Sequence, residues 1–246
     1  MIEVKKLSKA FGPIVAVDGI SFSVARGDVL GFLGPNGAGK TTTMKMLSCF
    51  LKPDSGTAMI QGHDILREPI AVRRIVGYLA ENSPAYDEMT PESFLKFVCE
   101  TRGILGKKRA KAIAEIARDC AIEDVMHQMI GTLSKGYRRR VGLAQALVHN
   151  PPVLFLDEPT DGLDPNQKYD VRRLIKNLAS KKAIVVSTHI LEEVDAICNR
   201  IVIISQGRLL VDSTPEKLRQ AESSELDSIF RKLTRHGKTP ALGGAA

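Results

Sequence analysis

Residues 34–42, GPNGAGKTT, have the composition and spacing of a loop that binds phosphate groups. They match the pattern G-x4-G-K-[ST], follow a predicted strand and open a predicted helix, which is the context that this loop requires. The glycines let backbone N–H groups turn inward around phosphates, Lys40 adds positive charge, and the Thr41 hydroxyl can ligate Mg²⁺. A purely structural turn is the alternative, which the flanking strand and helix disfavour. The pattern predicts a nucleotide held by Gly34, Pro35, Asn36, Gly37, Ala38, Gly39, Lys40, Thr41 and Thr42.

Two further apolar runs, residues 152–157 and 183–188, lead into side chains that can bind a metal or move a proton. In an open parallel sheet, ligands lie beyond the carboxyl ends of the strands. Asp157 can hold the hydration shell of a metal, Glu158 can take a proton from an attacking water, and His189 can reach a terminal phosphate. Each has an ordinary alternative, such as a helix cap or a structural histidine. Three strands that converge on one phosphate site favour the functional interpretation.

A second candidate anion site begins in residues 133–140, LSKGYRRR, where a Ser and a Gly stand at a predicted helix start. Free N–H groups at a helix start, with a dipole of about half a charge, attract anions. A helix from Ser134 to residue 150 is roughly 24 Å long, and the strand that ends at Asp157 advances only about 17 Å. We therefore expect Ser134 and Gly136 to lie away from the chain's own phosphate loop and to serve another molecule's nucleotide. An ordinary helix cap at Ser134 is the alternative.

The elements that must position these residues are those of an α/β protein. Short β-branched runs alternate with helical patterns, which is typical of parallel strands joined by crossover helices. Residues 1–12 and 20–27 instead form short alternating segments, which predict antiparallel strands. Strand patterns give way to helical ones over residues 83–150, which predicts an inserted helical part.

These patterns predict one domain over residues 1–246. Its α/β core, with the antiparallel part, is expected at residues 1–82 and 151–220, and the helical part lies between them. Residues 221–246 are expected to hold one more amphipathic helix and a disordered end. The apolar positions that predict this helix are Leu226, Ile229, Phe230 and Leu233.

Composition excludes several classes of protein. The net charge of +7 fits a polyanionic partner, a membrane surface or simply a basic solvated face, and the last needs no special partner. Four scattered cysteines predict reduced thiols in the cytoplasm and disfavour a zinc site. The longest apolar runs fall far short of the roughly 20 residues that cross a bilayer, so membrane association would go through a partner.

Together these motifs resemble the nucleotide-binding subunits of ABC transporters, from residue 11 to about residue 234. The matching segments are Walker A (34–42), the signature motif (LSKGY, 133–137), Walker B (LFLDEP, 154–159), the D-loop (DGLD, 161–164) and the switch-histidine loop (STH, 187–189). The resemblance implies a P-loop NTPase of the RecA-like type that binds ATP and Mg²⁺. It also places Phe11 where the family stacks an aromatic ring on adenine, and it implies that Ser134 and Gly136 contact ATP across a dimer.

The sequence departs from the family pattern at two motifs. The usual signature is LSGGQ, whereas this chain has Lys135 and Tyr137 and so lacks the glutamine contact. The glutamine of the family's Q-loop is replaced by Glu81, which has a similar reach toward the metal but adds negative charge near the phosphates. The segments YLAEN, YDEMT and LSKGYRRR resemble an export-type branch that includes drug, sodium, copper-related and gliding-associated exporters.

The resemblance therefore implies an ATPase that forms a homodimer, or a heterodimer with a similar subunit, and drives a transmembrane permease. It would lie on the cytoplasmic face of the membrane, with no nucleic acid as partner. One alternative is a soluble ABC-type ATPase that acts on nucleic acid or ribosomes, using the run from Arg138 to Arg140. Such proteins usually carry coiled-coil insertions or two ATPase domains, and this chain has one Walker A loop and no heptad run. A non-catalytic regulatory module is the third possibility, disfavoured because Lys40, Asp157, Glu158 and His189 are all present.

Overall fold

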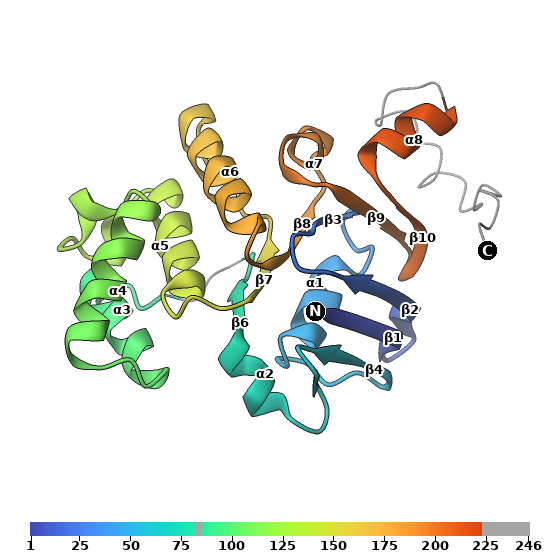
Figure 1. The fold of residues 1–246 in the computed structure, drawn as a ribbon, viewed down its shortest axis with the longest axis horizontal. Helices are drawn as coiled ribbons and strands as arrows, with labels where there is room; N and C mark the ends of the chain where they lie inside the picture. Colours follow the sequence, from blue (N-terminus) through green and yellow to red (C-terminus); the bar gives the residue numbers. More distant parts are fainter. Residues whose placement is uncertain (82–84, 223–246) are drawn as a thin grey trace.

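The computed structural model describes residues 1–81 and 85–222, which fold into a β-rich part and a helical part (Figure 1). The helix expected through Leu226 to Leu233 lies outside the described residues. None of the helices in the described part of the chain has the length and apolar character that a membrane crossing needs.

The central sheet positions the strand ends that the sequence singles out. Among the described residues it has six strands in the order β10-β9-β3-β8-β7-β6, and β10 at the edge is antiparallel to β9 while the other neighbours are parallel. Its strands are β3 (Val29–Leu33), β6 (Val76–Leu79), β7 (Val153–Asp157), β8 (Ala183–Thr188), β9 (Arg200–Ser205) and β10 (Arg208–Ser213). The expected parallel core is confirmed.

The N-terminal part forms a separate antiparallel sheet, as its alternating pattern predicts. The strand order is β2-β1-β4-β5, with β1 (Ile2–Phe11), β2 (Ile14–Val24), β4 (Ser55–Ile60) and β5 (His63–Asp64). The antiparallel prediction covered the first two of these strands. Strand β5 has only two residues, too few to show a period in sequence.

Two hydrophobic cores lie on opposite faces of the central sheet, because successive side chains of a strand point to opposite sides. Leu30 and Phe32 of β3 belong to the core shared with the antiparallel sheet and α1 (Lys40–Leu47). Leu33 of the same strand belongs to the other core, which extends into the helical part. Strand β3 is buried along its whole length and anchors the loop that follows it.

The helical part lies at one end of the molecule (Figure 1). Its described helices are α3 (Pro91–Thr101), α4 (Gly106–Asp119) and α5 (Lys135–Leu147), with short 3₁₀ turns at Glu123–Val125 and Ile130–Thr132. The remaining helices are α2 (Pro69–Ile75), α6 (Pro165–Ala179), α7 (Leu191–Ile197) and α8 (Pro215–Glu222). Helix α5 begins at the expected place, with Ser134 as its N-cap, but ends at Leu147. It stops before residue 150 because Asn150 adopts a left-handed conformation, with φ 49°, ahead of two prolines.

Candidate functional site

The loop at residues 34–39 joins the end of β3 to the start of α1, and two of its glycines cannot be replaced by a larger residue. A Cβ atom on Gly34 would lie 2.4 Å from the carbonyl oxygen of Ile204. Gly39 has φ 105°, and its Cβ would lie 2.3 Å from the carbonyl oxygen of Ala16. The close packing of β2 and β9 around the loop therefore requires glycine at both positions.

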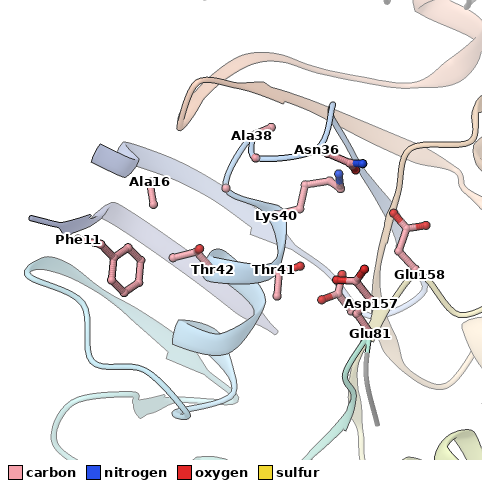
Figure 2. Close-up of a pocket in the computed structure, with 12 residues that line it drawn as sticks. Phe11, Ala16, Asn36, Ala38, Lys40, Thr41, Thr42, Glu81, Asp157 and Glu158 are labelled. Carbon is pink, nitrogen blue, oxygen red and sulfur yellow. The ribbon is translucent and has the colours of Figure 1, made fainter. Parts of the chain in front are cut away.

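Lys40 brings a positive charge into this loop. Its Nζ donates hydrogen bonds to the carbonyl oxygens of Gly34, at 2.7 Å, and Pro35, at 3.2 Å. Burial lowers the pKa of Lys40, while the carboxylates of Glu158 and Asp157 act in the opposite direction. The ammonium group is thus held at the loop. It faces the acidic wall of the cavity, formed by Glu81, Asp157 and Glu158 (Figure 2).

A cavity of about 420 Å³ runs along the loop. Figure 2 shows an aromatic end at Phe11 and an acidic end at Glu81, Asp157 and Glu158. The residues that line it are Phe11, Ala16, Asn36, Gly37, Ala38, Gly39, Lys40, Thr41, Thr42, Glu81, Asp157 and Glu158. The cavity can therefore take a ligand with one flat apolar group and one strongly anionic group.

The acidic end has the groups that a hydrated Mg²⁺ ion uses. Asp157 ends β7 and is buried, and its Oδ1 accepts a hydrogen bond from the Ser187 hydroxyl. Its Oδ2 is buried and has no hydrogen-bond partner among the described residues. Thr41 and Glu81 lie beside it at the cavity wall (Figure 2). One free carboxylate oxygen, a hydroxyl and a second carboxylate fit Mg²⁺, which keeps several waters and shares its coordination with phosphates.

The described residues contain no group of three or more His, Cys, Asp or Glu side chains that would hold a metal alone. A magnesium ion at this site would therefore depend on oxygens from a phosphate ligand. This is the usual arrangement in nucleotide-hydrolysing enzymes.

Glu158 and His189 form a pair next to the acidic end. His189 Nδ1 lies 2.8 Å from Glu158 Oε1, a hydrogen bond in which the ring nitrogen donates to the carboxylate. Glu158 is mostly buried, and its backbone has φ 50°, which is unfavourable for a residue with a side chain. Its N–H donates to the carbonyl oxygen of Ser187 at 3.0 Å. The pair can accept a proton and redistribute charge.

The start of α5 lies apart from this cavity. Within the described chain, neither Ser134 nor Gly136 lines it. The Ser134 side chain is an N-cap that accepts from the Tyr137 N–H at 3.3 Å. Gly136 is buried, and a Cβ atom there would lie 2.4 Å from the side-chain oxygen of Gln167 in α6. Lys135 pairs with Asp161 at 2.7 Å on the exposed surface.

The run of three arginines does not form a single basic surface. Arg139 and Arg140 are buried and donate to backbone carbonyl oxygens, and the exposed Arg138 does so as well. This arrangement removes the feature that the nucleic-acid alternative would use.

Two functional candidates were missed by sequence reasoning. One is Arg139, because nothing in the run of three consecutive arginines distinguishes it from its neighbours. The other is Glu193 in α7, which has no exposed surface and accepts hydrogen bonds from the hydroxyls of Thr160 and Thr188. Burial raises the pKa of Glu193. No sequence signal distinguishes it from its exposed neighbour Glu192, since both belong to one short helix.

Comparisons with known proteins agree with this geometry. A family model described as ABC transporter matches residues 17–161. A solved structure, described as the ATP-binding subunit of an ABC transporter, has a TM-score of 0.87 and 28% sequence identity, and the match covers 95% of this chain and 99% of the other.

Two curated relatives match most of this chain. A daunorubicin resistance ATP-binding protein, DrrA3 of Streptomyces coeruleorubidus, is 36% identical over 98% of this chain and 77% of its own length. YbhF of Escherichia coli, named as a probable multidrug ABC transporter ATP-binding protein, is 34% identical over 92% of this chain. The chain spans only 39% of the length of YbhF.

Proposed function

This chain belongs to the ABC transporter family of ATP-binding proteins, and on that premise we propose that it hydrolyses ATP to power export through a separate transmembrane subunit. The observation that carries the proposal is the cavity that joins Phe11 to the acidic wall across a glycine loop. It offers one place for an adenine ring and another for a triphosphate. The names of DrrA3 and YbhF, which refer to drug resistance and multidrug transport, support the direction of transport.

ATP is held along this cavity from one end to the other. Phe11, which is about half exposed, stacks on adenine, and Ala16 and Thr42 line the cavity with it. The N–H groups of the glycine loop and the Lys40 ammonium hold the β- and γ-phosphates. Thr41, Asp157 and Glu81 would hold Mg²⁺. When bound, this ion neutralises charge on the β- and γ-phosphate oxygens.

Hydrolysis follows from the groups at the acidic end. Glu158 accepts a proton from a water molecule as the water oxygen forms a bond to the γ-phosphorus. The bond between this phosphorus and the bridging oxygen breaks, and ADP and phosphate are released. His189 holds Glu158 through its 2.8 Å hydrogen bond. In this proposal it also stabilises the transferred group.

The start of α5 acts in a dimer. Two subunits, identical or similar, meet head to tail, so that Ser134 and Gly136 of each one cover the ATP on the loop of the other. Closure of the dimer on ATP and its reopening after hydrolysis move a transmembrane permease. The subunit lies on the cytoplasmic face of the membrane through this permease.

The Glu158→Gln variant tests the proposal. Glutamine has the same shape but cannot accept the proton, so ATP turnover should fall by about 100-fold or more, while ATP still binds. Phosphate release and binding of a fluorescent ATP analogue are the measurements. Glu192→Gln is the matched control, because that carboxylate lies exposed on α7 and pairs with Arg172. Turnover near that of the wild type in Glu158→Gln would remove Glu158 from the proposed role.

A further inference from the structure

Arg139, the middle arginine of the 138–140 run, connects α5 to the ends of β6 and β7, where the residues of the acidic wall lie. Arg139 is 7% exposed and belongs to the first turns of α5. Its Nη1 donates to the carbonyl oxygens of Ala80, at 2.6 Å, and Glu81, at 2.8 Å. Its Nη2 donates to the carbonyl oxygens of Glu158, at 2.7 Å, and Asp157. All four hydrogen bonds go to main-chain atoms.

These carbonyl oxygens lie just beyond the place where two neighbouring strands stop pairing. Strands β6 and β7 are paired in register from Val76 with Val153 to Leu79 with Leu156. At the next residues, one guanidinium group contacts both strands. A planar group with two donor arms fixes the spacing of its acceptors better than a flexible ammonium does. Arg139 therefore continues the connection between β6 and β7 past the end of the ladder.

The same contacts hold an unfavourable backbone conformation. Glu158 has φ 50°, a region that residues other than glycine rarely adopt. Its N–H is bound to Ser187 and its carbonyl oxygen to Arg139. With both backbone groups fixed, its carboxylate can be directed to His189.

The charge of Arg139 also lies among carboxylates. Burial lowers its pKa, and Asp157, Asp161, Glu158 and Glu81 each act in the opposite direction. An arginine guanidinium is not deprotonated in proteins, so Arg139 keeps its positive charge beside these acidic groups. Glu81 adds a negative charge that the usual glutamine of the family would lack, and this charge and that of Arg139 attract each other.

We propose that Arg139 is a positioning residue, which sets the places of Glu81, Asp157 and Glu158 and ties them to the helix that begins at Ser134. Its catalytic consequence rests on the proposed function, because the carboxylates matter only if they act on ATP. Its structural consequence does not: the ends of β6 and β7 should lose their fixed spacing when the guanidinium is removed.

The test compares Arg139→Lys with Arg138→Lys. Both substitutions keep the charge and remove a guanidinium from the same helix. Arg138 is exposed and donates to the carbonyl oxygens of Leu133 and Gly131, in the segment just before α5. Hydrogen exchange of the peptides that cover residues 76–81 and 153–158 reports the strand ends. The kcat for ATP hydrolysis and the affinity for ATP without Mg²⁺ show whether catalysis or binding at the cavity is changed.

Arg139→Lys should lower kcat by about tenfold or more, because small displacements of catalytic groups have large effects on rate. Affinity for ATP without Mg²⁺ should stay within about threefold, which separates positioning from loss of binding. Exchange should be faster at the two strand ends and unchanged in α3 and α4. Arg138→Lys should behave as the wild type in all three measurements.

Two results would overturn the proposal. One is a kcat of Arg139→Lys within about twofold of the control, with unchanged exchange at the strand ends. The other is faster exchange along the whole chain with a lower melting temperature, which would make Arg139 an ordinary stabilising residue. If the wild type itself hydrolyses no ATP, the proposed function fails, and the local exchange data still decide whether Arg139 positions the strand ends.

Discussion

The starts of α1 and α5 use the same physical device in opposite surroundings. Each presents free N–H groups that favour an anion. The start of α1 borders a cavity whose other walls come from the same chain, among them Phe11, Asp157 and Glu158 (Figure 2). The start of α5 carries the exposed side chains of Ser134 and Lys135 and belongs to the helical part (Figure 1).

The difference lies in what surrounds each helix start. At α1 the chain supplies a lysine, a hydroxyl and carboxylates. Under our proposal, one molecule therefore holds the groups for binding and for proton transfer. At α5 the side chain of Lys135 is paired with Asp161, and Ser134 only caps the helix. Under our proposal, the second helix start is completed by the nucleotide on another subunit. The comparison therefore predicts that substitutions at the start of α1 weaken ATP binding in a single chain. Substitutions at the start of α5 should affect ATP hydrolysis only when two subunits meet.

Lys40→Ala should have the largest effect of the substitutions that separate the two regions. A charge-assisted hydrogen bond contributes about 1.5–3 kcal/mol, so the affinity for Mg·ATP should fall by about 10- to 150-fold. Hydrolysis should fall with it. Titration with a fluorescent ATP analogue measures the change. Lys45→Ala, at an exposed position of the same helix, should bind as the wild type does. An equal loss of affinity for Mg·ATP in both variants would show that the positive charge of α1 attracts ATP from any position, and that the place of Lys40 in the loop does not matter.

Sequence reasoning predicted the strand, loop and helix of the α1 region because their requirements are local. The glycines, Lys40 and Thr41 are contiguous, and their flanking strand and helix have clear patterns. Asp157 and Glu158 could be assigned to the same edge because parallel strands end together. The antiparallel part and the helical insertion were also predicted from periodicity.

The contacts around α5 could not be predicted in the same way because they join residues far apart in sequence. Arg139 contacts Ala80, a separation of 59 residues. No sequence pattern shows that Arg139 and Arg140 are buried while Arg138 is exposed. Glu193 is buried by the packing of α7 on the core, whereas Glu192 beside it is exposed. Helix α2 (Pro69–Ile75) was not predicted from the sequence.

Lys135→Gln should have the smallest effect, because the Lys135 side chain takes part in an exposed ion pair. The pair of Lys135 with Asp161 is exposed, and such pairs contribute about 0–1 kcal/mol to the free energy of unfolding. The hydrogen bond from Lys135 lowers the pKa of Asp161 below its usual value. The contribution is therefore present above about pH 4 and is lost as the pH falls through the pKa of folded Asp161.

Urea unfolding at several pH values measures this effect. The difference between wild type and Lys135→Gln should be small at pH 7 and should shrink on acidification. A loss above about 2 kcal/mol at pH 7 would exceed the range for exposed pairs. In that case the start of α5 would be held as firmly as the loop before α1, and the comparison would lose its basis.

The contact between subunits is the central claim, and mixing two inactive variants tests it most directly. Lys40→Ala disables the loop of one chain, and Ser134→Ala disables the α5 start of the other. Thr90→Ala is the control for loss of a cap, since Thr90 caps α3 in the same way, by accepting from the Ser93 N–H. This control should retain hydrolysis.

In an equal mixture, half of the dimers pair one chain of each kind. In each mixed dimer, one of the two sites combines an intact loop with an intact Ser134. If the subunits meet head to tail and one intact site suffices, ATP hydrolysis should therefore recover to about one quarter of the wild-type rate. A rate equal to the average of the two variants measured separately, under conditions in which wild-type dimers form, would contradict the account.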